Sequence, residues 1–202
     1  NTNSIDAIKK QLQDDWSLND FYREFFKDNF EEAQINFTQS LAAYSLVCYL
    51  LQIKDRHNGN ILIDKHGHII HIDFGFVLGI SPGNLNFESA PFKFTKEYME
   101  IMEEEHFQYF KLLMLRGLLE LKKHIDYLVN IVKVMSSRSK MPCFNSADKA
   151  EVVISKFRER FHLNKSESEL KKLVNDLVEK SLDNFWTKRY DSFQNITNGI
   201  KY

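Results

Sequence analysis

The 202-residue chain has little cysteine, proline or glycine, with two, three and seven residues of these types. Its cysteines, Cys48 and Cys143, lie far apart and show neither disulfide nor metal-ligand spacing, which predicts a reduced, cytoplasmic setting. The prolines, at positions 82, 91 and 142, mark two loops. Charge of one sign is not in excess, because 27 basic residues face 28 acidic ones. We therefore expect no nucleic-acid partner, and any anionic partner must be bound by local groups.

Long hydrophobic runs are also lacking. The longest apolar stretch, 41–53, is too short and too interrupted to span a bilayer, and no signal peptide is recognisable. We therefore expect any membrane contact to be peripheral. With 43% hydrophobic residues the chain is still able to bury a core, so we expect one domain or one large lobe.

Helical periodicity dominates what is present. N-cap residues predict helix starts after Ser4, after Ser17 with its capping partner Asp20, and after Thr95. The predicted helices cover 5–13, a segment from 18 onward, 30–52, 96–102, 106–122, 125–135, 148–161, 167–182 and 184–195. Segment 61–72 alternates as a β-hairpin does, so the expected fold class is α+β, mainly α.

Two short motifs bracket this predicted hairpin. Asp55-Arg56-His57-Asn58-Gly59-Asn60 precedes it, and Asp73-Phe74-Gly75 follows it. His66-Gly67 suits a two-residue primed turn, which would place Asn60 opposite Asp73 and gather Ile61, Ile63, Ile70 and Ile72 on one apolar face. A carboxylate and an amide oxygen at the open end of a hairpin suit a hard cation such as Mg²⁺. The alternative is an ordinary β-ribbon whose Asp and Asn only cap turns.

The motifs resemble a kinase signature in a reversed form. Protein kinases have His-Arg-Asp, then Asn, then Asp-Phe-Gly. Asp55-Arg56-His57 with Asn60 is instead similar to the phosphoinositide kinases and the phosphatidylinositol-3-kinase-like protein kinases. The amino-acid sequence of residues 50–62 and 67–76 resembles the type III phosphatidylinositol 4-kinases, most of all their beta form. The resemblance continues through 45–49, 141–144, 158–162 and 195–200, so it covers most of the chain.

The resemblance implies a protein-kinase-like C-terminal lobe over residues 1–202, in which one β-hairpin carries the catalytic and metal-binding loops. The chain has no G-x-G-x-x-G and no Val-Ala-Ile-Lys-like strand before the catalytic motif. We therefore expect the N-terminal lobe, with its glycine-rich loop and ATP-binding lysine, to lie outside this chain.

The resemblance also implies ATP and Mg²⁺, or Mn²⁺, as cofactors. Asp73 would hold a Mg²⁺ that bridges the ATP phosphates, with Asn60 on the same or a second ion, and Ile72 would join both in contacting the nucleotide. Asp55 would orient the lipid hydroxyl or accept its proton, and His57 would act as base or stabilise the γ-phosphate. Arg56 is expected to brace the loop, and His71, beside the predicted metal end, is expected to orient Asp73.

Two lysines are candidates for substrate binding. Related lipid 3-kinases have glycine at the position of Lys54, so lysine here points to a 4-kinase; the alternative is a lysine that pairs with an activation-loop carbonyl. Between Phe74 and Phe94 the only ionisable residues are Glu88 and Lys93. A single lysine suits a head group with one phosphodiester charge, so Lys93 is assigned to unmodified phosphatidylinositol.

The sequence thus predicts ATP-dependent phosphorylation of phosphatidylinositol at the 4-hydroxyl, giving phosphatidylinositol 4-phosphate. The alternatives are a protein Ser/Thr kinase of the same superfamily and a non-catalytic scaffold lobe. Resemblance to the beta form implies peripheral association with Golgi membranes and regulation by small GTPases and calcium sensors. The apolar activation-loop residues are expected either to enter the acyl boundary of a membrane or to pack on the lobe.

Overall fold

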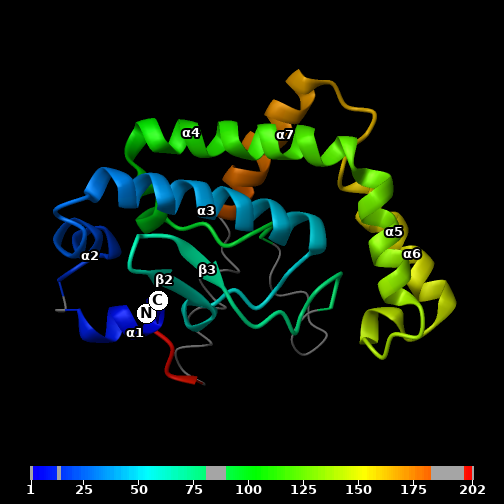
Figure 1. Ribbon diagram of the computed structural model, residues 1–202, viewed down its shortest axis with the longest axis horizontal. Coiled ribbons are helices and arrows are strands. Elements are labelled where there is room, and N and C mark those ends of the chain that lie inside the picture. The colour runs from blue at the N-terminus through cyan, green and yellow to red at the C-terminus, as the bar shows by residue number, and fades with distance from the viewer. Residues whose placement is uncertain (1, 13–14, 81–89, 183–197, 202) are drawn as a thin grey trace.

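The computed structural model describes residues 2–12, 15–80, 90–182 and 198–201. The described part is mainly helical, with a small antiparallel sheet (Figure 1). The α-helices are α1 (Ile5–Gln11), α2 (Leu18–Phe25), α3 (Phe30–Leu51), α4 (Lys96–Lys123), α5 (Ile125–Ser136), α6 (Ala147–Glu159) and α7 (Glu167–Leu182). The strands are β1 (Thr2–Ser4), β2 (Ile61–Asp64) and β3 (Ile69–His71), and two short 3₁₀ helices, η1 (Asn58–Asn60) and η3 (Pro142–Phe144), complete the elements.

The predicted helix starts are confirmed because each rests on a local hydrogen bond. The Ser4 hydroxyl accepts from the Ala7 N–H at 3.1 Å. Ser17 and Asp20 form a complete capping box at the start of α2. Thr95 accepts from the Tyr98 N–H at 3.3 Å. The predicted helix over 184–195 lies outside the described residues.

Helices α3 and α4 pack along one another above the sheet (Figure 1). Gly117 of α4 permits this approach, because a Cβ there would lie 2.5 Å from Leu46 Cδ1. The two helices predicted over 96–102 and 106–122 follow one another directly within α4. The break between them is Glu103, whose backbone (φ 54°, ψ −174°) is not helical.

The predicted hairpin exists, but its predicted register is wrong by one residue. Ile61 lies opposite His71, and Ile63 lies opposite Ile69. The turn has three residues instead of two, and it ends with Gly67 at φ 85°. The Asp64 N–H donates to the His68 carbonyl at 3.0 Å, and the Gly67 N–H donates to the Asp64 carbonyl at 3.1 Å. A glycine in the left-handed region suits this bulged turn as well as the two-residue one.

The slip changes which side chains face the core. Ile61, Ile63, Ile69 and His71 are buried on the side of α3, whereas Ile72 is 40% exposed. The predicted apolar face is therefore wrong for Ile70 and Ile72. Strand β1, which was not predicted, pairs with β2 and extends the hairpin to three strands in the order β1-β2-β3.

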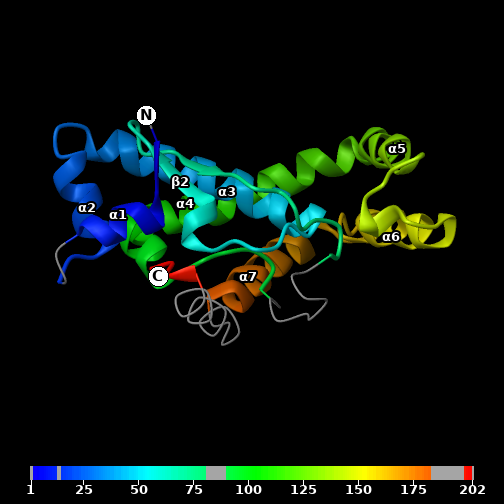
Figure 2. The ribbon, with the colours of Figure 1, turned by 90° about the horizontal axis from the view of Figure 1, so that it is seen from below.

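The remaining helices lie around α3, α4 and the sheet (Figure 1). Helices α5 and α6 lie side by side at the end of the molecule away from α1 and α2, and α7 contacts α4 (Figures 1 and 2). The described C-terminal segment returns to α1, where the Lys201 N–H donates to the Asp6 carboxylate. Among the described residues no helix combines the length and apolar character needed to cross a membrane.

Candidate active site

The two sequence motifs lie side by side. Helix α3 ends at Leu51, and the next residue, Gln52, adopts a left-handed conformation (φ 50°) that turns the chain into the segment containing Asp55. The Lys54 N–H donates to the Phe76 carbonyl at 2.9 Å, and the Leu78 N–H donates to the Leu51 carbonyl at 2.7 Å. The segment after Asp-Phe-Gly is thereby fixed along the segment that contains Asp55.

Arg56 joins the two motifs from the inside. Its side chain is 1% exposed, and its guanidinium donates from Nε to the Lys54 carbonyl at 3.0 Å and from Nη1 to the Ile72 carbonyl at 2.8 Å. Nη2 donates to the Asp73 carbonyl, and the guanidinium carbon lies 5.6 Å from the centre of the Phe74 ring. A planar fork of donors suits this spread of acceptors. The contacts agree with the bracing role expected of Arg56.

Asn60 closes the open end of the hairpin. Its backbone carbonyl accepts from the Ile72 N–H at 3.0 Å, so Ile72, and not Asp73, is its cross-strand partner. The predicted direct pairing of Asn60 with Asp73 is therefore wrong, because the register of the hairpin is shifted by one residue. The side-chain amide is buried and donates from Nδ2 to the Asp55 carbonyl at 3.0 Å. With the nitrogen held by that bond, Oδ1 is the other end of the amide and is able to accept or coordinate.

Asp73 lies one residue beyond this pair, where the chain leaves the strand with φ 56°. Its side chain is exposed, and Oδ1 accepts from the Gly75 N–H at 3.3 Å. Asp73 and Asn60 therefore remain at the same end of the hairpin. Amide and carboxylate oxygens fit Mg²⁺, which is commonly bound by one or two protein groups together with substrate phosphates. Among the described residues, no group of three or more His, Cys, Asp or Glu could hold a metal ion.

Asp55 and His57, which the sequence predicts to be catalytic, lie close together. His57 Nδ1 accepts from the Gly59 N–H at 3.1 Å, and Nε2 lies 3.9 Å from Asp55 Oδ1. A neutral imidazole that accepts at Nδ1 carries its proton on Nε2. Both side chains are largely enclosed, with 13% exposure for His57 and 15% for Asp55. The ring thus presents a donor on the side of the carboxylate.

His71 lies on the opposite face and does not support Asp73, contrary to the expectation from its position. Its ring stacks on Tyr44 at 4.4 Å, and Nδ1 lies 3.6 Å from Cys48 Sγ. Burial, with a smaller contribution from the charge of Arg56, lowers the pKa of His71 to about 3. His71 is therefore a neutral core residue near pH 7.

Of the two candidate substrate lysines, Lys93 is buried and Lys54 is half-buried. Lys54 Nζ donates to the Ala90 carbonyl at 3.1 Å, which is the activation-loop contact that the alternative interpretation described. Lys93 is 4% exposed. Leu78 and Phe92 are buried in the core, so these two apolar loop residues pack on the lobe. Substrate binding by Lys54 and Lys93 stays a prediction.

The chain is similar in sequence to known proteins. A sequence profile of the family "Phosphatidylinositol 3- and 4-kinase" matches residues 6–146. The chain belongs to this family. Proteins named phosphatidylinositol 4-kinase beta from Sorex araneus and Danio rerio are 48% and 47% identical to it over 207 residues, or 99% of the chain. Phosphatidylinositol 4-kinase beta 2 from Arabidopsis thaliana is 47% identical over 210 residues. The chain spans 25%, 24% and 18% of the lengths of these three relatives.

Two further residues of this family member support the catalytic loop and were not predicted. A Cβ at Gly59 would lie 3.0 Å from His57 Nδ1 and Cε1, so a hydrogen at this position leaves room for the ring. Asn58 is buried and donates from Nδ2 to the Lys201 carbonyl at 2.9 Å. The glycine two residues after the histidine was a visible signal. The contact with Lys201 joins residues 143 positions apart and has no local signal.

Proposed function

We propose that this chain is the C-terminal lobe of a phosphatidylinositol 4-kinase and supplies its catalytic loop, its metal-binding Asp-Phe-Gly and its activation loop. The reaction is transfer of the γ-phosphoryl group of ATP to the 4-hydroxyl of phosphatidylinositol. The observation that carries the proposal is the set of contacts made by Arg56. One buried guanidinium bonds to both motifs and so keeps Asp55, His57, Asn60 and Asp73 at one end of the hairpin.

Asn60 Oδ1 and the Asp73 carboxylate would hold the magnesium ion of ATP, and Ile72 would contact the nucleotide beside them. The ion supplies charge neutralisation for the phosphate oxygens. The protein contributes position, because the Asn60 amide is fixed by Asp55 and the Asp73 backbone is fixed by Arg56. Pre-set positions of this kind reduce the reorganisation needed at the moment of transfer.

The tautomer of His57 favours a division of roles. Because the Nδ1 lone pair is engaged by the Gly59 N–H, the neutral ring carries its proton on Nε2 and offers Nε2–H as a donor to a phosphate oxygen. Asp55 then orients the lipid hydroxyl and accepts its proton. Single-turnover rates of Asp55→Asn and His57→Gln test this division: we expect the larger loss in Asp55→Asn, and the reverse order contradicts it.

Lys93 and Lys54 are proposed to bind the phosphodiester of phosphatidylinositol. Lys93 is buried, and Lys54 is half-buried and bonded to the Ala90 carbonyl, so both side chains would exchange their present contacts for the lipid phosphate. Relatives named phosphatidylinositol 4-kinase beta support this choice of lipid. Membrane association is proposed to be peripheral, and the Golgi location with small GTPase and calcium-sensor partners stays a prediction from the family resemblance.

The test is a transfer assay on the whole protein with labelled ATP, phosphatidylinositol vesicles and a peptide acceptor, followed by identification of the phosphorylated position. We expect phosphatidylinositol 4-phosphate and no labelled peptide. Labelled peptide in place of lipid would favour the protein kinase alternative, and no labelled product would favour the scaffold lobe.

Asp73→Asn should reduce lipid phosphorylation at least about a thousandfold, because the metal loses its charged ligand. Asp64→Asn is the matched control at the other end of the same hairpin, where the carboxylate accepts from the His66 and His68 N–H groups. An asparagine oxygen is still able to accept there, so turnover should change little. Retained activity in Asp73→Asn would remove the metal assignment.

A further inference from the structure

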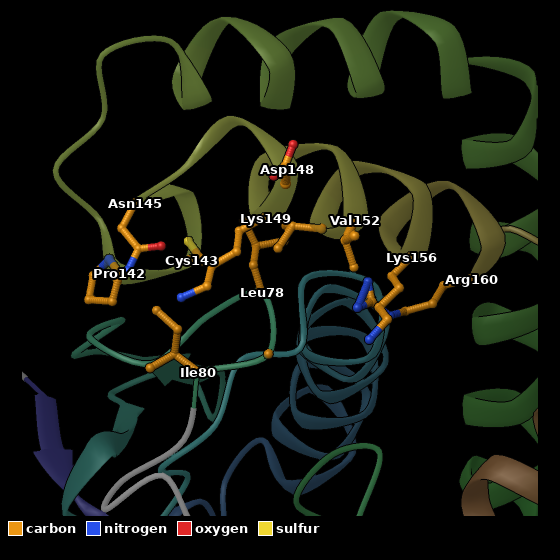
Figure 3. A pocket seen from close by; sticks show the side chains of 12 residues that line it. Leu78, Ile80, Pro142, Cys143, Asn145, Asp148, Lys149, Val152, Lys156 and Arg160 are labelled. Carbon is orange, nitrogen blue, oxygen red and sulfur yellow. The ribbon is translucent and has the colours of Figure 1, made fainter.

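A second cavity lies outside the candidate active site. It has a volume of about 580 Å³ and is bounded by the segment after Asp-Phe-Gly, by η3 and by one face of α6 (Figure 3). Pockets for small ligands commonly have volumes in this range. The cavity does not include Asp55, His57, Asn60 or Asp73.

The α6 wall of the cavity is basic. Lys149, Lys156 and Arg160 line it, with Asp148 as the one acidic lining residue among those described. In Figure 3 the side chains of Lys156 and Arg160 descend from α6 into the cavity, whereas the Asp148 carboxylate points away from Leu78 and Ile80. A concave surface lined by one sign of charge concentrates its field and attracts anions.

These three cations have no carboxylate partner within the described part of the chain. Arg160 donates from Nη1 to the Leu50 carbonyl at 3.0 Å, and burial lowers its pKa, so its charge is poorly solvated. The neighbouring Arg158 differs, because it pairs with Asp126 at 2.7 Å and does not line the cavity. An anion in the cavity would supply the missing countercharge.

Apolar side chains line the cavity beside these cations. Leu78 and Ile80 come from the segment after Asp-Phe-Gly, and Val152 projects from α6 between the lysines. Val152 is 52% exposed, so its side chain is accessible to an apolar group in the cavity. A soluble anion would leave these walls in water, whereas an amphiphilic anion would cover both the charges and the apolar surface.

We propose that this cavity binds an anionic phospholipid, with its phosphate on Lys149, Lys156 and Arg160 and the first carbons of its acyl chains against Leu78, Ile80 and Val152. The site is separate from the place of phosphoryl transfer. This inference goes beyond the proposed function and does not require catalysis. It does place a second lipid contact next to the activation loop.

The test is equilibrium binding of the whole protein to dihexanoyl phosphatidic acid, a short-chain lipid that is soluble as a monomer. Glycerol 3-phosphate and dihexanoyl phosphatidylcholine are the comparison probes, because they lack the acyl chains and the net charge, respectively. We expect saturable binding of the anionic lipid and affinity at least about tenfold weaker for each comparison probe. Equal affinity for glycerol 3-phosphate would identify a free-phosphate site and overturn the proposal.

The variants Lys149→Gln with Lys156→Gln, and Val152→Asp separately, should each raise the dissociation constant about tenfold or more. All three positions are exposed on α6, so folding is not at risk, whereas Arg160 is avoided because it bonds to Leu50. Arg158→Gln is the matched control and should leave the affinity unchanged. Asp73→Asn should also bind normally, which separates this site from the metal end of the hairpin. Affinity unchanged in both cavity variants contradicts the proposal.

Discussion

The two ends of the β2–β3 hairpin are held in different ways. The closed end is fixed by packing against α2 and α3: the Tyr22 hydroxyl donates to the Gly67 carbonyl at 2.9 Å, and Asn36 Nδ2 donates to the His66 carbonyl at 2.8 Å. The open end is fixed by one buried cation, Arg56, which bonds to the backbone of Lys54, Ile72 and Asp73. The closed end therefore serves stability, and the open end holds reactive side chains in position.

This difference predicts which substitutions affect catalysis and which affect folding. At the closed end, side chains from α2 and α3 bond to the backbone of the turn, far from the two motifs. At the open end Asp73 keeps an exposed carboxylate while its backbone is held from within. A rigid backbone with accessible side chains is the arrangement that catalytic positioning requires.

Arg56→Met should have the largest effect, because it removes the link between the motifs and leaves the Ile72 and Asp73 carbonyls without their donor. We expect lipid phosphorylation to fall at least about a hundredfold and the open end to be destabilised by about 2–4 kcal/mol. Transfer rates and hydrogen exchange at residues 72–76 of the whole protein would measure these effects. Arg158→Met, at an exposed ion pair, is the control, and equal losses in both variants would contradict the bracing role.

Gly67→Ala should mainly affect stability. Its backbone lies at φ 85°, and a Cβ would come within 2.8 Å of the Ala33 carbonyl oxygen, so we expect a cost of about 2–4 kcal/mol. Faster hydrogen exchange of the β2 and β3 amides would show this loss of stability. Molecules that remain folded should phosphorylate lipid at nearly the normal rate. A strong loss of turnover without a loss of stability would remove the distinction between the two ends.

His71 should make the smallest change near pH 7, and its contribution becomes visible as a pH dependence. Its folded pKa of about 3 lies below the value of 6.5 of an unperturbed histidine, so the unfolded chain binds the extra proton first. The contribution of His71 to the free energy of unfolding is fully present above pH 6.5. It is lost as the pH falls toward 3, by about 1.4 kcal/mol per pH unit.

His71→Phe should flatten this pH dependence relative to the unchanged protein, as measured by hydrogen exchange of the β3 amides between pH 4 and 7. Phenylalanine keeps an aromatic ring to stack on Tyr44. An unchanged slope would show that the imidazole is not the group responsible.

The sequence predicted features that depend on neighbouring residues. The caps at Ser4, Ser17 and Thr95 each join residues three positions apart. Each of the two motifs is a short run of consecutive residues and was recognisable for that reason. The hairpin register was not predictable in this way, because His66-Gly67 suits a two-residue and a three-residue turn alike. The longer turn is accompanied by the Asp64 carboxylate, which accepts from His66 and His68, and by the fit of Gly67 against Ala33.

Long-range contacts explain the other differences at the site. Lys54 bonds to a carbonyl 36 residues away, and Asn58 bonds to one 143 residues away. His71 was expected beside Asp73, but the shifted register turns it toward Cys48. Strand β1 is only three residues long, so its pattern was too short to distinguish from a helix-preceding segment.

The most direct test of the account is the Mg²⁺ dependence of ATP binding to the whole protein, measured by calorimetry with and without the ion. Asn60→Leu and Asp73→Asn should each abolish most of the gain in affinity that Mg²⁺ gives the unchanged protein, while binding of metal-free ATP stays nearly the same. A full Mg²⁺ effect in both variants would show that the open end of the hairpin does not hold the ion, and the catalytic assignment would fail with it.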